Sequence, residues 1–454
     1  MPAAFVPAGN QPRGPLFPEY FLYRLSYYRV MTTPVIHIVG TPYVPGSARG
    51  RLQRGLGDNP AGKIVLLEQP PAGPFESPPA GFVMVDGAPF SHSLIPLLGS
   101  AIPTIMINHS QAEGLQAGME LVLDGATGLL STDLSMHIPE PESPDAGVSA
   151  TADGVAVSLR VSARNRQAVQ SAVETGAGAI GLLRSEFLAP EDGRLPNAAF
   201  YRAAFRELCE TAGGRPLTIR LFDVAVSKRP AWLHLSPADA GVLGRQGVRL
   251  YADEPVHGIY RAQLAAIAEL AAEFELRILL PYVADCEELQ YWRDDIRKLL
   301  VRPVMIGAMA ETPAAALALR EWLEIVEFVA IGCNDLMQCL FGADRDQPGL
   351  QRYLDPYAPA LYRFLRQVAA TVPDRLEAVQ LCGVLPQLPG ILPLLLGLGY
   401  RVFSVEAALL PYLWQTIAAT HTGEARELAG RVCSAPGSAA VRELLDRHTN
   451  PLQA

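Results

Sequence analysis

The sequence predicts an α/β protein with a C-terminal (β/α)8 barrel, preceded by a smaller domain of short strands. Eight apolar, strand-like runs recur between Ala179 and Ala407 with helical stretches between them, which is the count and length of an ordinary barrel. The runs are apolar without alternation, as parallel strands covered on both faces should be. The alternative, an open doubly wound sheet, is disfavoured by the count of eight.

The eight runs give the predicted barrel strands in chain order. They are AIGLLR, LTIRLFD, GRQGVRL, LRILLPYV, VMIGAMAE, FVAIGCND, AVQLCGV and YRVFSVEA. The helical stretches between them would cover the outside of the ring. We therefore expect a TIM barrel with C-terminal helices over residues 151–454.

The part before the barrel divides into three segments. Residues 1–30 are rich in Pro, Gly and aromatic residues and are interpreted either as an ordered N-terminal arm or as a misassigned start, with Met31, just before a strand-like run, as the candidate native start. Between residues 31 and 134, short β-rich runs alternate with Gly/Pro turns, which predicts a small α/β domain. Residues 135–150 are rich in Pro, Ser and acidic residues without periodicity, which indicates a linker.

Composition argues against several classes of protein. The 46 acidic and 37 basic residues give a net charge of -9, which disfavours a broad basic surface for nucleic acid. No apolar run reaches the length of a membrane span, and the N-terminus lacks a signal-peptide pattern. The six cysteines form no CxxC pair and no zinc spacing. We expect a cytoplasmic protein without nucleic-acid binding or membrane insertion.

Polar side chains stand at the carboxyl ends of the predicted strands, which in a barrel surround one mouth. Glu311 and Asp335 follow the fifth and sixth runs. Two carboxylates, completed by substrate oxygens and water, are a usual protein share of a Mg²⁺ site. Four arginines would suit a small phosphate-bearing anion. They are Arg184, Arg220, Arg249 and Arg345. A structural network of salt bridges is the competing interpretation.

Two further residues are candidates for chemistry. Cys382 ends the seventh run, where it could donate a proton, although a buried strand cysteine more commonly only packs. We assign Cys333 to packing.

His92 lies in DGAPFSHSLIPLLG, where Ser91 would cap a helix and place His92 in its first turn. A helix N-terminus would stabilise a phosphorylated imidazole, but an isolated histidine of this kind is more often polar surface.

A series of motifs occurs along the chain in a fixed order. It consists of DGAPFSHSLI, VLDGATGLL, GAGAIGLLRSEFL, TIRLFD, GRQGVRL, MAETPAAAL, IGCNDLMQ and LCG. The series resembles the phosphoenolpyruvate (PEP)-utilising phosphotransferases. It is most similar to enzyme I, the phosphoenolpyruvate–protein phosphotransferase of the bacterial sugar phosphotransferase system. The resemblance is specific from about Thr151 to Leu413 and weaker from about Ile36 to Thr132.

The resemblance implies a role for each candidate. Glu311 and Asp335 would bind Mg²⁺, and Cys382 would protonate the enolpyruvate carbon as pyruvate forms. His92, on a swivelling phosphohistidine domain, would carry the phosphoryl group to an acceptor protein, for which an HPr-like carrier is a candidate. The residues that would hold PEP are Arg184, Arg220, Arg249, Asn334, Arg345 and Lys228. The resemblance also implies a homodimer formed through the barrel.

The chain departs from the family pattern before the barrel. About 30 residues separate Arg51 from Phe82, too few for the helical domain with which enzyme I docks HPr. The histidine segment is altered to GAPFSH, and Pro96 falls within the predicted helix, where proline would remove a donor or cause a kink. Two alternatives stay open. One is an enzyme whose acceptor is a small molecule or a separate nucleotide-binding subunit, and the other is a regulatory pseudoenzyme that binds PEP without turnover.

Overall fold

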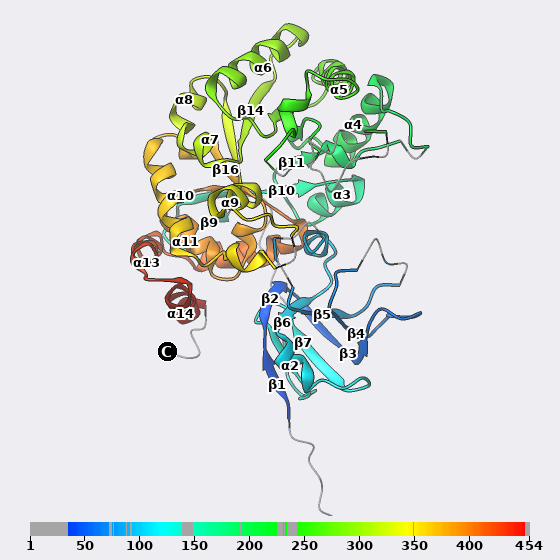
Figure 1. The fold of residues 1–454 in the computed structure, drawn as a ribbon, viewed down its shortest axis with the longest axis vertical. Helices are drawn as coiled ribbons and strands as arrows, with labels where there is room; N and C mark the ends of the chain where they lie inside the picture. Colours follow the sequence, from blue (N-terminus) through cyan, green and yellow to red (C-terminus); the bar gives the residue numbers. More distant parts are fainter. Residues whose placement is uncertain are drawn as a thin grey trace, which may run out of the picture. The chain divides into compact units, whose positions relative to one another are not determined.

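Figure 1 shows the fold in a computed structural model of the protein. The structure describes residues 35–71, 75, 77–87, 89–90, 93–138, 149–190, 192–224, 230, 232–233, 243–347 and 349–449. The predicted arm, residues 1–30, lies outside these ranges. Within them, no helix is both long and apolar enough to cross a membrane.

The first sheet is mixed and has eight strands in the order β1-β8-β7-β3-β4-β5-β6-β2. Their bounds are β1 His37–Val39, β2 Thr41–Val44, β3 Ser47–Arg54, β4 Ile64–Leu67, β5 Gly81–Val85, β6 Thr104–Ile107, β7 Glu120–Asp124 and β8 Leu129–Ser131. Strands β3 to β6 run parallel, and the remaining pairs are antiparallel. Two short helices, α1 (Ile95–Leu98) and α2 (His109–Glu113), accompany the sheet. The predicted region of short strands is thus confirmed.

The second sheet contains a closed ring of eight parallel strands. They are β10 Ala156–Ala163, β11 Ile180–Arg184, β12 Leu217–Arg220, β13 Leu276–Leu280, β14 Met305–Ala310, β15 Phe328–Gly332, β16 Val379–Cys382 and β17 Val402–Val405. β10 pairs with both β11 and β17, which closes the ring and confirms the predicted barrel. Strand β9 (Ser149–Ala150), from the end of the predicted linker, pairs antiparallel with β10. Residues 139–148 of that linker lie outside the described ranges.

Helices follow the barrel strands (Figure 1). They are α3 Arg166–Glu174, α4 Ala198–Ala212, α5 Val256–Leu270, α6 Cys286–Leu299, α7 Pro313–Leu317, α8 Leu319–Leu323, α9 Cys333–Phe341, α10 Pro359–Thr371, α11 Ile391–Gly397, α12 Leu410–Ala419, α13 Thr422–Ser434 and α14 Ser438–Thr449. Side chains cap several of their first turns: Asn165, Asn197 and Asp285 each accept a hydrogen bond from the backbone N–H three residues later. Each such cap gives its helix a defined start after the preceding strand.

One predicted strand is wrong. GRQGVRL ends in a 3-10 helix, η4 (Gly247–Leu250), and the first barrel strand is instead β10. Gly247 has a φ of +56°, and a Cβ there would lie 2.6 Å from the Cβ of Tyr282, so glycine permits a tight turn at this point. β10 was overlooked because its sequence, AVSLRVSA, alternates polar and apolar residues. The predicted count of eight strands is still correct, because one wrongly predicted strand and one missed strand compensate for each other.

Candidate active site at the mouth of the barrel

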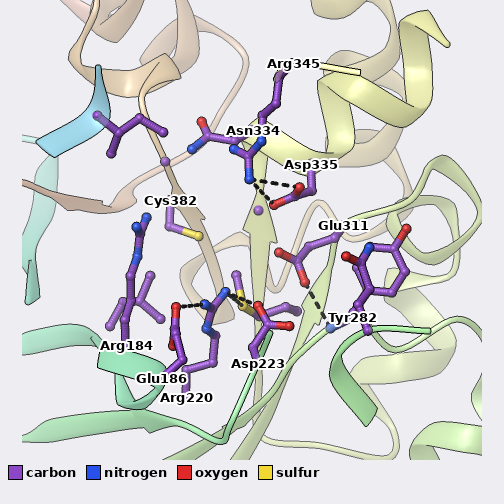
Figure 2. Close-up of a pocket in the computed structure, with 16 residues that line it drawn as sticks. Arg184, Glu186, Arg220, Asp223, Tyr282, Glu311, Asn334, Asp335, Arg345 and Cys382 are labelled. Carbon is purple, nitrogen blue, oxygen red and sulfur yellow. Dashed lines mark hydrogen bonds and ion pairs between the residues drawn. The ribbon is translucent and has the colours of Figure 1, made fainter. Parts of the chain in front are cut away.

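A cavity at the carboxyl ends of the barrel strands brings together seven of the ten predicted site residues (Figure 2). They are Arg184, Arg220, Glu311, Asn334, Asp335, Arg345 and Cys382. Three of them end strands β11, β12 and β16, and Glu311 directly follows β14. The cavity holds about 610 Å³, counting its part open to solvent. The barrel topology therefore gathers side chains that are up to 198 positions apart in the chain.

Arg249 is not part of the lining. It lies on η4, with its guanidinium carbon 4.9 Å from the centre of the Tyr282 ring. The guanidinium also donates to two backbone carbonyls of its own loop, at 3.1 and 3.3 Å. Gln246, three residues earlier, lines the cavity instead. Because η4 is a turn, Arg249 does not end a strand at the mouth as the sequence suggested.

His92 and Lys228 lie outside the described residues. The helix that follows His92 is α1, which begins at Ile95 with Leu94 as its N-cap. The expectation that Ser91 caps a helix and places His92 in its first turn falls on residues outside the described ranges. Pro96 falls in the first turn of α1, where a missing N–H costs little, so it does not interrupt the helix as expected.

Arg220 is held between two carboxylates (Figure 2). One terminal nitrogen donates to Glu186 Oε1 at 2.5 Å, and the other pairs with Asp223 Oδ2 at 2.9 Å. Burial lowers the pKa of this guanidinium, but the charges of Asp223, Glu186, Glu311 and Asp335 outweigh burial and raise the pKa overall. Arg220 therefore remains a fixed positive charge in the floor of the cavity.

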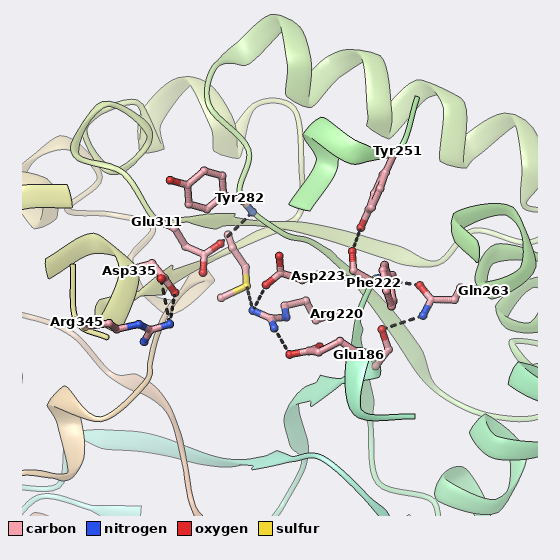
Figure 3. Close-up of polar contacts among 12 residues, drawn as sticks. Glu186, Arg220, Phe222, Asp223, Tyr251, Gln263, Tyr282, Glu311, Asp335 and Arg345 are labelled. Atoms are coloured by element: carbon pink, nitrogen blue, oxygen red, sulfur yellow. Dashed lines mark hydrogen bonds and ion pairs between the residues drawn. The ribbon is translucent and has the colours of Figure 1, made fainter. Parts of the chain in front are cut away.

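Glu311 is 2% exposed and accepts a hydrogen bond from the Tyr282 N–H at 2.9 Å (Figure 3). Burial raises the pKa of its carboxyl to about 8, with a further contribution from the negative charges of Asp335 and Asp223. Gly332 leaves room for this side chain, because a Cβ at that position would lie 2.8 Å from Glu311 Oε1. A bound cation would relieve the repulsion among these carboxylates.

Helix α9 starts directly after β15 and presents two polar side chains to the cavity. Asn334 Oδ1 accepts a hydrogen bond from the Val384 N–H at 2.9 Å, which ties α9 to the loop after β16. Gly383 in that loop has a φ of +103°, and a Cβ there would lie 2.7 Å from the same oxygen. Asp335 pairs with Arg345 at 3.1 Å. These contacts place the start of α9 beside the end of β16.

Cys382 and Arg184 offer different chemistry from the same rim. The Cys382 thiol is buried and donates to the Ile331 carbonyl oxygen at 3.4 Å. Burial, and then the charge of Glu311, raises the pKa of this thiol to about 12, so it keeps its proton at neutral pH. Burial and the charge of Arg220 lower the pKa of Arg184, whose Nε finds no hydrogen-bond partner among the described residues. Arg184 can thus donate to an anion.

Four polar lining residues were not among the predicted candidates. They are Glu186, Asp223, Gln246 and Tyr282. Glu186 and Asp223 follow Arg184 and Arg220 by two and three residues, and that proximity to predicted cavity arginines was the available signal. The sequence gave no comparable signal for Gln246 and Tyr282, because each lies in a loop and its position depends on how that loop folds.

Gln263 on α5 fixes the segments that carry Glu186 and Asp223 (Figure 3). Its side-chain oxygen accepts from the Phe222 N–H at 2.8 Å, and its amide donates to Ser185 Oγ at 2.9 Å. Gln263 is fully buried, so both bonds are shielded from water. A single side chain thereby joins the residues that follow β11 and β12.

We expect Gln263→Leu to lower the free energy of unfolding by about 1–3 kcal/mol, because it leaves the Phe222 N–H and the Ser185 hydroxyl buried without this partner. Chemical denaturation measures the change. Gln170→Leu on the exposed face of α3 is the matched control and should shift stability by less than about 0.5 kcal/mol. Equal losses in the two variants would contradict the role given to Gln263.

Known proteins are similar in sequence to the barrel region and to much of the chain before it. The PEP-binding domain of PEP-utilising enzymes matches residues 143–422, which include the whole ring of parallel strands. The chain is 30% identical to the phosphoenolpyruvate-protein phosphotransferase of Haloferax volcanii, over 87% of this chain and 75% of that protein. It is 32% identical to the protein of the same name from Streptomyces coelicolor, over 74% of this chain and 63% of that protein.

A third relative is the multiphosphoryl transfer protein 1 of Escherichia coli, 25% identical over 82% of this chain and 47% of that protein. The chain thus spans between about half and three quarters of the length of these three relatives. The resemblance found in the sequence is confirmed by the family match, which covers more than half of the chain. This chain belongs to the family of PEP-utilising enzymes.

Proposed function

We propose that the chain is a transferase that moves the phosphoryl group of PEP onto His92, releases pyruvate, and passes the phosphoryl group to an acceptor protein. The supporting observation is that three arginines, four carboxylates and a protonated thiol converge on one cavity of a PEP-binding barrel. The relatives named phosphoenolpyruvate-protein phosphotransferase support a protein as the acceptor. The role of His92 rests on the sequence resemblance.

PEP carries a phosphate and a carboxylate on a three-carbon frame, so its site needs positive charge over a short span. Arg184 offers donors that no described carboxylate occupies, and Arg345 lies across the cavity mouth beside Asp335 (Figure 2). Arg220 adds a charge whose position Glu186 and Asp223 fix. Guanidinium groups match both anions of PEP in geometry. Asn334 would add a neutral donor, and Lys228 and Arg249 complete the proposed set by resemblance.

Glu311 and Asp335 would hold Mg²⁺. Among the residues that the structure describes, no group of three or more His, Cys, Asp or Glu side chains could hold a metal ion. Two carboxylates with substrate oxygens and water suit Mg²⁺, which keeps part of its water shell in such sites. Burial, and then repulsion from Asp335 and Asp223, raise the pKa of Glu311, and a divalent cation would relieve that repulsion. When bound, Mg²⁺ would neutralise charge on the phosphoryl oxygens.

Cys382 would complete the release of pyruvate by a proton transfer. Cleavage of the bond between phosphorus and the bridging oxygen leaves the enolate of pyruvate, as phosphorus bonds to an imidazole nitrogen of His92. Carbon 3 of the enolate then takes the proton from Cys382 Sγ, and the thiolate recovers a proton from water. The high pKa of the thiol ensures that the proton is present at neutral pH.

Replacing Cys382 by alanine should slow pyruvate formation by about 100-fold or more and leave the Kd for PEP nearly unchanged. Cys333→Ala is the matched control, because the Cys333 thiol is equally buried and donates to the same Ile331 carbonyl, at 3.7 Å, but does not line the cavity. Pyruvate formation and calorimetric titration with PEP measure the two effects. Full turnover by Cys382→Ala would assign this cysteine to packing.

Mg²⁺ binding should release protons below about pH 8, where the buried Glu311 carboxyl of the metal-free protein is protonated. The apparent affinity for Mg²⁺ should therefore fall as the pH decreases through 8, by up to about tenfold per pH unit. Calorimetry in two buffers of different ionisation enthalpy counts the protons. Absence of proton release at pH 7 would contradict the assignment.

The stability of the metal-free protein should change with pH in the opposite direction. The folded chain holds the Glu311 proton more tightly than the unfolded chain, so the free energy of unfolding should fall as the pH rises from 4.5 to about 8.

The proposal is tested by following pyruvate after mixing the chain with PEP and Mg²⁺. Without an acceptor we expect at most one pyruvate per chain, and continued turnover only after an acceptor protein such as an HPr-like carrier is added. Turnover supported by a small molecule or a nucleotide-binding subunit would favour the first alternative. PEP binding with no pyruvate would favour the pseudoenzyme.

We further propose that the protein works in the cytoplasm as a homodimer formed through its barrel, which sedimentation with PEP and Mg²⁺ would test.

A further inference from the structure

A second pocket lies at the opposite end of the barrel, where the strands begin. Its lining includes Ser149, Ser158, Arg160, Gly178, Arg277 and Trp414, which together define the basal pocket. Ser158 and Arg160 are the third and fifth residues of the eight-residue β10, Gly178 precedes β11, and Arg277 is the second residue of β13. The pocket holds about 580 Å³, counting its part open to solvent. None of its residues lines the cavity at the mouth.

The fold holds Arg160 in a defined position. One terminal nitrogen donates to Gln380 Oε1 at 3.2 Å, and the Gln380 amide donates in turn to the Gly181 carbonyl at 3.2 Å. Gly181 leaves space for the arginine stem, because a Cβ there would lie 2.6 Å from the Arg160 Cβ. Strands β10, β11 and β16 therefore cooperate to place this guanidinium at the base of the barrel.

The basal pocket carries more positive than negative charge. Arg160 forms its side-chain hydrogen bond with the neutral Gln380, and within the described ranges no carboxylate lies within ion-pair distance of it. Arg277 pairs with Glu275 at 2.8 Å, but this carboxylate is 56% exposed and contacts only one terminal nitrogen. The Nε of Arg277 is buried and has no partner in the part of the chain that the structure describes.

Arg160 is half-buried, and a partly desolvated guanidinium without a counter-charge carries a free-energy cost. Burial, and then the neighbouring charge of Arg277, lower the pKa of Arg160 to about 10. An oxyanion between the two arginines would offset both effects, since guanidinium forks match phosphate and carboxylate geometry. The hydroxyl of Ser158 and the open space beside Gly178 leave room for the rest of a small molecule.

We propose that the basal pocket binds a small anionic metabolite through a phosphate or carboxylate group held by Arg160 and Arg277. This site is separate from the proposed PEP site and does not depend on the proposed function. Trp414 lines the pocket and lies 7% exposed, so its fluorescence should report an anion that enters. Titration with inorganic phosphate and with succinate distinguishes the two anion types, and sodium chloride at equal ionic strength corrects for screening.

We expect a saturable fluorescence change with phosphate, succinate or both, and none with chloride. Trp414→Phe should remove the fluorescence change but keep the increase in Tm that the anion causes. Arg277→Gln should weaken binding by at least about tenfold, because it removes half of the guanidinium pair. Arg297→Gln loses the same charge from an exposed ion pair on α6 and should bind like the parent.

Two results would overturn the proposal. One is a response that depends on ionic strength alone, without saturation by either oxyanion. The other is unchanged affinity in Arg277→Gln, which would place the bound anion elsewhere, for example at the mouth. Because Arg160 lies partly inside the barrel, Arg160→Lys serves only as a second variant. Arg160→Lys keeps the positive charge but loses the forked hydrogen-bond donors of the guanidinium, so it should also weaken anion binding.

Discussion

Replacing Glu311 by glutamine should abolish the Mg²⁺ dependence of PEP binding and slow pyruvate formation on the order of 100-fold or more. Glutamine has the same shape and keeps an oxygen that can accept the Tyr282 N–H, now 2.9 Å from the carboxylate. It lacks the negative charge that a hard cation requires. The loss should therefore concern metal binding rather than folding.

Calorimetric titration of PEP with and without Mg²⁺ measures this loss directly. Glu288→Gln is the matched control, since Glu288, although only half-buried, is also a carboxylate that accepts a backbone N–H, from Ala284 at 2.7 Å, but does not line the cavity. This control should keep the full Mg²⁺ effect. If Glu311→Gln binds PEP with undiminished Mg²⁺ dependence, the metal site lies elsewhere.

Replacing Arg184 by methionine should weaken PEP binding by about 10- to 100-fold, because charge-assisted hydrogen bonds to one anion are lost. Arg184 forms no ion pair with a described carboxylate, whereas Arg220 and Arg345 each pair with one or two, and methionine keeps much of the apolar stem of arginine. The Kd for PEP, measured by calorimetry with saturating Mg²⁺, reports the effect.

Arg249→Met is the informative comparison. Arg249 was predicted to hold PEP, but it lies on η4 over the Tyr282 ring and outside the cavity lining. We therefore expect a smaller change in Kd than for Arg184→Met. A larger effect at Arg249 would mean that its loop moves toward the ligand, and would reverse our ranking of the two arginines.

The sequence was most informative where strand position alone decided the outcome. Glu311 and Cys382 were predicted because they end apolar runs, and parallel strands in a closed ring must bring such ends to one mouth. β10 was missed because its inner face carries Arg160 and Ser162, so that it lacks the continuous apolar character of a central strand. Gly247 was predicted as part of a strand because a positive φ at a glycine cannot be recognised from the residue types around it.

The remaining site residues depend on contacts that sequence does not record. Glu186 and Asp223 matter because Arg220 lies between them, and Gln263 matters because it reaches Phe222 from a helix 41 positions away. Helix α1 starts at Ile95 after Leu94, whose apolar side chain cannot cap a helix, so the sequence carries no capping signal at this start.

Locating the phosphoryl group after reaction with labelled PEP tests most directly whether His92 accepts it. The chain is incubated with PEP and Mg²⁺, and the label is traced under alkaline conditions, in which phosphohistidine survives. We predict that the label is found on His92, that His92→Ala carries none, and that His109→Ala, which removes an exposed histidine at the start of α2, is labelled like the parent. Absence of label on a chain that demonstrably binds PEP, or label that persists in His92→Ala, would contradict the account.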